Sequence, residues 1–131
     1  MGAAIPLIAI IDDDIAVRHA ISNLLQSAGF RTASFASAEE FLALESTELD
    51  CLIVDVRLPG MDGLELHRTL ASGGRNLPVI LVSGHATETM RQQALAGGAA
   101  DFLAKPFADV ALVHSLNHAL KSQLSHMTGA A

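Results

Sequence analysis

Six polar residues come directly after four apolar runs, and their types suit metal and phosphate chemistry. In chain order they are Asp12, Asp13 and Asp14 after 7–11, Asp55 after 51–54, Ser83 after 78–82, and Lys105 after 101–104. The runs are rich in β-branched residues and predict strands of a parallel sheet that is buried on both faces. Ligands of such sheets bind outside the carboxyl ends of the strands. We therefore expect carboxylates, a hydroxyl and an ammonium to meet at one edge.

Clustered carboxylates repel one another unless a cation joins them. Their hard oxygens suit Mg²⁺, which keeps waters and accepts phosphate oxygens. Asp55 could then act as a nucleophile toward phosphorus and form an aspartyl phosphate. Lys105 would supply a positive charge and Ser83 a hydroxyl donor. Simpler explanations exist for each residue alone, such as a helix-capping Ser83 or a solvent-exposed Lys105, but they explain the whole set poorly.

Strands and amphipathic helices alternate along the chain. Strands are predicted at 7–11, 31–35, 51–54, 78–82 and 101–104, and helices at 16–28, after a Ser37–Glu40 capping box, around 64–70, at 86–96 and at 110–124. Alternation of this kind predicts an α/β fold, a (βα)₅ doubly wound parallel sheet of five strands with helices on both faces.

Four motifs at the strand ends resemble the receiver domain of two-component response regulators. They are Ile11-Asp12-Asp13-Asp14, the segment from Val54 to Gly63, Val82-Ser83-Gly84-His85, and the segment from Asp101 to Phe107. Each motif is weak alone, but four in this order are specific, and the resemblance is closest to receivers that precede a helix-turn-helix output domain. It implies a flavodoxin-like sheet of strand order 2-1-3-4-5, with a receiver domain at 1–126 and a C-terminal tail at 127–131.

The resemblance also implies roles for individual residues. Asp55 corresponds to the phosphoacceptor, and Asp13 and Asp55 to direct Mg²⁺ ligands that are joined by the backbone carbonyl of Arg57. Asp12 corresponds to the acid that binds the metal mostly through water. Ser83 corresponds to the hydroxyl residue that turns toward the phosphoryl group, and Phe102 stands at the aromatic switch position. Lys105 corresponds to the lysine that pairs with the phosphoryl group, and the Lys105-Pro106 peptide would be cis. Ser83 keeps the hydroxyl of the commoner Thr, whereas Phe102 lacks the phenol of the commoner Tyr.

The function implied is a phosphorylation-activated switch in a two-component phosphorelay. A sensor histidine kinase would donate the phosphoryl group, and the changed surface would bind a downstream output domain or protein, or a second copy as a homodimer. The domain would not be an enzyme beyond catalysing its own phosphorylation and dephosphorylation.

Composition sets limits on the partners and the compartment. Net charge is −6, from 14 acidic and 8 basic residues, and no Lys/Arg-rich run occurs, which argues against binding to nucleic acid or an anionic membrane surface. Cys51 is the one cysteine and opens an apolar run, so we expect a buried thiol. Neither a signal peptide nor an apolar stretch of ~20 residues is evident, and we expect a cytoplasmic protein.

Three other functions account for part of the pattern. A haloacid-dehalogenase-type phosphatase would use Asp12 as nucleophile and Asp14 as acid/base, but it leaves Asp55 and its loop unexplained. A flavodoxin-like redox domain lacks a phosphate-binding loop after the first strand, and an interaction module without phosphorylation would not need this set of residues. His114 and His118 lie four apart, as zinc ligands can, yet no third ligand is in view. His85 is either a general base or a solvent-exposed loop residue.

Overall fold

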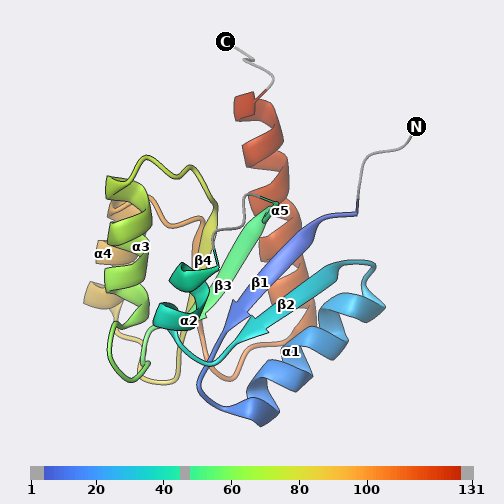
Figure 1. The fold of residues 1–131 in the computed structure, drawn as a ribbon, viewed down its shortest axis with the longest axis horizontal. Helices are drawn as coiled ribbons and strands as arrows, with labels where there is room; N and C mark the ends of the chain where they lie inside the picture. The colour runs from blue at the N-terminus through green and yellow to red at the C-terminus, as the bar shows by residue number, and fades with distance from the viewer. Residues whose placement is uncertain (1–4, 45–47, 128–131) are drawn as a thin grey trace.

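The computed structural model describes residues 5–44 and 48–127, with side chains up to Ser122. Five strands alternate with five helices (Figure 1). The strands are β1 (Leu7–Ile11), β2 (Arg31–Phe35), β3 (Cys51–Asp55), β4 (Val79–Ser83) and β5 (Asp101–Ala104). The helices are α1 (Ile15–Ser27), α2 (Ala38–Ala43), α3 (Gly63–Ser72), α4 (Glu88–Ala96) and α5 (Asp109–Met127).

All strand pairs are parallel and form one sheet of order β2-β1-β3-β4-β5, which confirms the predicted class and strand order. Alternate residues of each strand face opposite layers. One hydrophobic cluster joins Ala9 and Leu52 to α2, α3 and α4, and the other joins Ile8 and Ile53 to α1 and α5. The sheet is therefore covered on both faces (Figure 1), and its inner strands are held rigidly from both sides.

Local details differ from the prediction at two helix starts. Ser37 caps α2 by accepting from the Glu40 N–H, but the Glu40 carboxylate accepts from Ala36 and not from the backbone of Ser37, so the capping box is only half formed. Helix α4 begins at Glu88 with Thr87 as its cap, because the Thr87 hydroxyl satisfies a free N–H of the first turn.

The far C-terminus was predicted as a tail at 127–131. Met127 belongs to α5, and 128–131 lie outside the described residues. Among the described residues, no helix has the length and apolar character needed to span a bilayer.

Candidate functional site

The register of the sheet gathers the predicted residues at its carboxyl edge. Ile11 pairs with Val54, so the residues that follow them, Asp12 and Asp55, end neighbouring strands at the same level. Asp55 pairs with Val82, one residue before Ser83, and Ser83 pairs with Ala104, one residue before Lys105. Parallel pairing alone therefore brings together residues that lie up to 93 positions apart.

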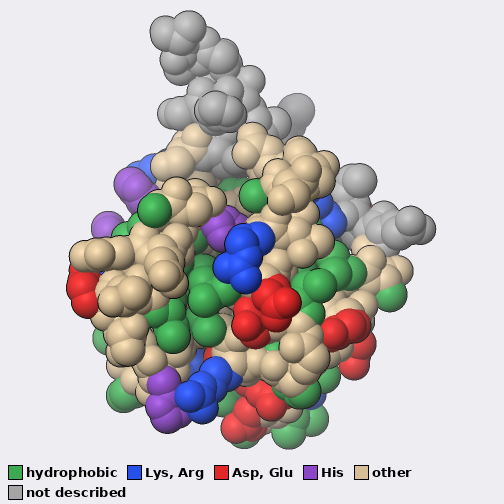
Figure 2. All heavy atoms as spheres, turned by 90° about the vertical axis from the view of Figure 1, so that its left-hand side faces the viewer, with side chains coloured by type: hydrophobic (Ala, Val, Ile, Leu, Met, Phe, Trp, Pro, Cys, Tyr) green, Lys and Arg blue, Asp and Glu red, His purple; other side chains and the backbone are tan. Residues whose placement is uncertain are grey.

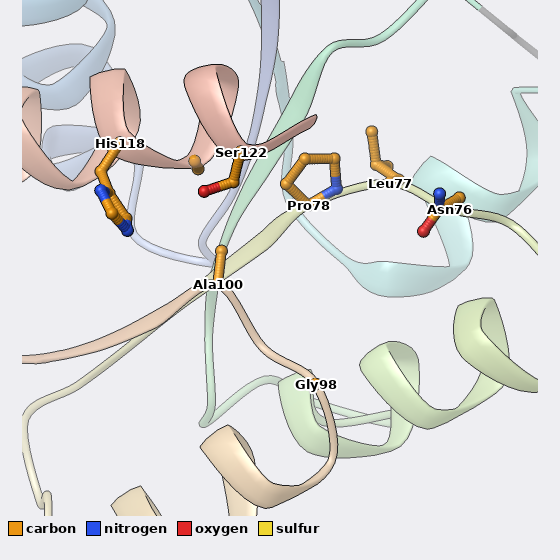
Figure 3. A pocket seen from close by; sticks show the side chains of 8 residues that line it. Asn76, Leu77, Pro78, Gly98, Ala100, His118 and Ser122 are labelled. Atoms are coloured by element: carbon orange, nitrogen blue, oxygen red, sulfur yellow. The ribbon is translucent and has the colours of Figure 1, made fainter. Parts of the chain in front are cut away.

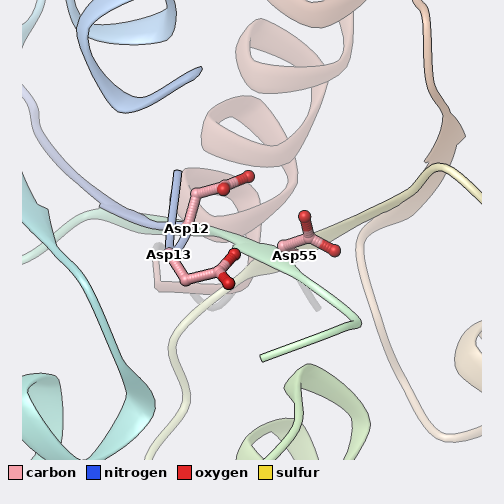
Figure 4. A group of neighbouring side chains, drawn as sticks. All are labelled: Asp12, Asp13 and Asp55. Carbon is pink, nitrogen blue, oxygen red and sulfur yellow. The ribbon is translucent and has the colours of Figure 1, made fainter. Parts of the chain in front are cut away.

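Three carboxylates form a cluster at this edge (Figure 4). One oxygen each from Asp12, Asp13 and Asp55 lie within 4.8 Å of one another. Asp12 and Asp55 are buried, whereas Asp13 is exposed. Charges at this separation raise each other's energy strongly where water is scarce, so the cluster requires a cation nearby.

Lys105 is the cation that the structure shows at this place. Its Nζ donates to Asp55 Oδ2 at 2.6 Å and to Asp12 Oδ2 at 2.9 Å. Burial lowers the pKa of Lys105, but hydrogen bonds to Asp55 and Asp12 and their charges outweigh burial, so the pKa is raised and the ammonium form is favoured. Burial also raises the pKa of Asp12, which its hydrogen bonds to Asp14 and Lys105 offset only in part. Lys105 thus neutralises part of the cluster.

Backbone groups fix the two buried carboxylates. Asp12 Oδ1 accepts from the Asp14 N–H at 2.9 Å, and Asp55 Oδ1 accepts from the Arg57 N–H at 2.9 Å. The Arg18 guanidinium donates to the Asp12 carbonyl at 2.7 Å, a contact that sequence reasoning missed, since nothing in the pattern of α1 singles out Arg18. One oxygen of each buried carboxylate is held by the backbone, and the other faces the cluster.

Close packing behind Asp55 depends on a glycine. A Cβ on Gly63 would lie 2.5 Å from the Asp55 backbone oxygen, which real Cβ atoms do not tolerate. Gly63 begins α3, and its N–H donates to the Val56 carbonyl at 2.9 Å. Helix α3 can therefore start directly against the end of β3.

The predicted switch residues lie on β4 and β5, the two strands on the other side of β3 from β1. Ser83 is fully buried, and its hydroxyl oxygen accepts from the His85 N–H at 3.1 Å, which leaves the hydroxyl proton free for an acceptor. Lys105-Pro106 is a cis peptide, as the resemblance implied. Phe102 is 5% exposed and packs in the core cluster that includes Leu81. In this conformation the ring already occupies the inward position.

Other candidate residues do not join the site. His85 is exposed. His114 and His118 are exposed on α5, and within the described residues the one group of three or more metal-binding side chains is the aspartate cluster. His118 lines a hollow beside Asn76 and Ser122 that contains no other metal-binding side chain (Figure 3). A solvent-exposed face of α5 is therefore the better description of the histidine pair.

The donor set fits Mg²⁺. Its members are hard carboxylate oxygens, which Mg²⁺ prefers, and one of them, from Asp13, is open to solvent and so can share the ion with water.

An open hollow lies beside the three carboxylates, lined by Asp13, the loop after β3 and Met90 of α4. On the face formed by α3 and α4, Lys and Arg side chains appear singly and not as a stripe (Figure 2).

A sheet of this order, with acids and a lysine at its carboxyl edge, places the chain in the doubly wound α/β class. The chain belongs to the family described as response regulator receiver domain, which matches residues 8–117. It is thus a receiver domain of two-component signal transduction.

Relatives and solved structures agree. The chain is 46% identical over 118 residues to the C4-dicarboxylate transport transcriptional regulatory protein DctD of Rhizobium meliloti (strain 1021), covering 89% of this chain and 26% of DctD. It is 43% identical to the response regulator protein TmoT of Ectopseudomonas mendocina, covering 88% and 53%. The receiver domain of the Francisella response regulator 1452 superposes with a TM-score of 0.85 at 27% identity, covering 90% and 98%. The chain spans between 26% and 56% of the length of curated relatives such as DctD and FixJ.

Proposed function

We propose that Asp55 accepts a phosphoryl group from a phosphohistidine of a sensor kinase. An Asp55 oxygen forms a bond to phosphorus, the bond from phosphorus to the imidazole nitrogen breaks, and the imidazole leaves with that electron pair. The observation that carries the proposal is the contact of Lys105 with Asp55 beside a cluster of three carboxylates. A later attack by water on phosphorus would restore the carboxylate and release phosphate, so the domain would catalyse only its own modification.

The place of β3 in the sheet favours Asp55 as the acceptor. Its neighbours are β1, which carries Asp12 and Asp13, and β4, which ends in Ser83. A phosphoryl group on Asp55 can therefore reach the metal-binding acids on one side and the Ser83 hydroxyl and Lys105 on the other. Mg²⁺, held by Asp13, Asp55 and the Arg57 carbonyl and by Asp12 through water, would neutralise charge on the phosphoryl oxygens.

The rival phosphatase assignment loses its acid/base residue. Asp14 is the N-cap of α1, and its carboxylate accepts from the Ala16 N–H at 2.9 Å. A side chain that closes the first turn of a helix is held by that task. Asp14 is therefore explained by the start of α1, and its carboxylate is not among the three that cluster at the site.

The partner that donates the phosphoryl group needs a surface beside Asp55. An apolar hollow of about 390 Å³ is lined by Lys105, which contacts Asp55, together with residues that include Val17, Leu24 and Phe107. Val110, which begins the exposed face of α5 nearby, is 76% exposed. We assign this hollow to the helix of the sensor kinase that carries the phosphohistidine, because Lys105 links it directly to the acceptor.

The effect of phosphorylation would pass from Asp55 through β4 and β5 to the surface. A dianionic group attracts the Ser83 hydroxyl and Lys105, since charge-assisted bonds exceed neutral ones. Phe102 is already buried, so the change at the surface of α4, β5 and α5 would come from locking its position rather than from withdrawing an exposed ring. That surface would bind an output module, as the longer transcriptional regulators suggest, or a second copy. The domain itself would not bind nucleic acid directly. It would act in the cytoplasm.

The test is phosphorylation with acetyl phosphate and Mg²⁺, followed by mass spectrometry. We expect one acid-stable, base-labile phosphoryl group on wild-type protein, located at Asp55 by peptide mapping. Asp55→Asn should abolish it, while Asp14→Asn, the matched control at the same edge, should accept phosphate like wild type. Modification at Asp12 in the intact protein would contradict the proposal and favour the phosphatase.

A further inference from the structure

The first turn of α2 carries two glutamates with different tasks. Glu40 accepts from the Ala36 N–H and its own N–H is capped by Ser37. Glu39 is exposed and is free of capping, and its Oε2 instead accepts from the Met61 N–H at 2.9 Å, across 22 positions of sequence. The link joins α2 to the loop of residues 56–62 that follows Asp55. It therefore connects a surface helix to the backbone beside the acceptor.

The fit between Glu39 and the loop is close. Gly60 has φ +74°, and a Cβ there would lie 2.6 Å from Glu39 Oε2. A side chain at Gly60 would thus be strained by the positive φ, whereas the Glu39 carboxylate, at the end of an exposed and flexible side chain, could move away from its Cβ. Hydrogen bonds from the Met61 and Glu39 N–H groups lower the pKa of Glu39, so the carboxylate is ionised near neutral pH. The loop thus presents the Met61 N–H to a charged acceptor.

Both ends of the loop are fixed by other contacts. At one end, the Arg57 N–H donates to Asp55 Oδ1. At the other end, Asp62 and Glu65 form a capping box that begins α3. Between these ends, Leu58 is buried in the core cluster and Met61 packs against it, and the Glu39 carboxylate adds a hydrogen bond to the backbone of the apex. Loss of this bond would leave the apex held by the apolar packing of Leu58 and Met61.

We propose that Glu39 is a positioning residue for the phosphoryl-transfer site, which acts by clamping the loop of residues 56–62 against α2. The clamp restricts the motion of the loop that begins at Arg57, whose N–H donates to Asp55 Oδ1 while Asp55 Oδ2 accepts from Lys105. It also holds one wall of the hollow that Asp13 and Met90 line. This inference rests on the proposed function, because it assumes that Asp55 is the acceptor.

The test compares Glu39→Ala and Glu39→Gln with Glu88→Ala, a matched control that removes an exposed first-turn glutamate from α4. We expect amide hydrogen exchange at Met61 and its neighbours to rise roughly tenfold in Glu39→Ala, the scale of one charge-assisted hydrogen bond. Glu39→Gln should lie between, since the amide oxygen still accepts. The urea midpoint should stay close to that of wild type in all three variants, which separates positioning from a loss of folding.

The functional readout is the rate of phosphorylation by acetyl phosphate at saturating Mg²⁺. We expect it to fall several-fold in Glu39→Ala and to be unchanged in Glu88→Ala. Equal rates in wild type and Glu39→Ala would overturn the clamp while leaving Asp55 as acceptor. Unchanged exchange at Met61 would overturn it as well. A wild-type protein that takes no phosphate would instead overturn the proposed function, and this inference with it.

Discussion

The two edges of the sheet end the same strands with different chemistry. At the carboxyl edge, Asp12, Asp55 and Lys105 form a largely buried charged network. At the amino edge, the hollow that precedes β4 and β5 is lined by Asn76, Pro78 and other residues, none of them acidic (Figure 3). Both edges have a hollow, but within residues 5–44 and 48–122 the one cluster of acidic side chains lies at the carboxyl edge.

This difference shows what the fold requires and what it does not. The amino edge is held by backbone bonds, such as those from Ala100 to Val79 and from Asp50 to Leu7, and by the exposed Asp50 carboxylate, which accepts from the Leu7 N–H at 2.8 Å. A parallel sheet can therefore end without buried carboxylates. Because burying charge costs free energy unless it is paired, the acids at the carboxyl edge are explained by chemistry and not by folding.

The largest expected effect comes from removing the cation. Lys105→Met should destabilise the metal-free protein by about 3 kcal/mol, because it leaves the Asp12 and Asp55 carboxylates buried without a partner. Urea unfolding near neutral pH measures the loss, which should shrink in acid as the carboxylates protonate. Lys121→Met, on the exposed face of α5, is the control. Equal stability of the two variants would mean that the charged edge costs nothing to maintain.

Adding a cation should have the opposite effect. Mg²⁺ that binds only the folded state should stabilise it by about 2.7 kcal/mol at a concentration of 100 times its Kd, seen as a rise in Tm. Asp13→Ala should lose most of this gain, because Asp13 offers the solvent-facing ligand of the cluster. Asn76→Ala, at the amino edge, should keep all of it. An undiminished gain in Asp13→Ala would remove Asp13 from the metal site.

A smaller effect is the pH dependence of the free energy of unfolding that arises from a histidine of α3 near the amino edge. His67 is buried there, and burial together with the charge of Arg68 lowers its pKa below the ordinary value of 6.5. The unfolded chain then binds more protons, so the contribution of His67 is fully present above pH 6.5 and is lost as the pH falls below 6.5 through the lowered pKa of the folded state. His67→Gln should flatten the loss of stability between neutral and mildly acidic pH in urea titrations. His118→Gln, on the exposed face of α5, should follow wild type.

Much of this architecture follows from local pattern. Continuous apolar runs such as Ile8-Ala9-Ile10-Ile11 specify inner strands, and the residue after each run lies at the carboxyl edge in any parallel sheet. Asp12, Asp55 and Lys105 were therefore predictable as neighbours.

Contacts between distant elements were not predictable in the same way. The bond from Met61 to Glu39 joins a loop to α2 without any periodicity that links them, and the inward position of Phe102 depends on packing around Leu81 and Ala94. His67 has no signal in sequence either, because its burial arises only when α3 and α4 meet. Pairing of distant side chains depends on tertiary geometry, which composition and residue spacing do not specify.

The reactivity of Cys51 reports the opening of the central strand of the sheet. It is the one cysteine of the chain, it is fully buried in β3, and burial raises its thiol pKa to about 12. Only the thiolate reacts with disulfide reagents, so modification must wait until the central strand opens. The rate at which a disulfide reagent labels Cys51 therefore reports how often β3 opens. This rate can be compared between protein with and without a phosphoryl group on Asp55, the residue that ends the same strand.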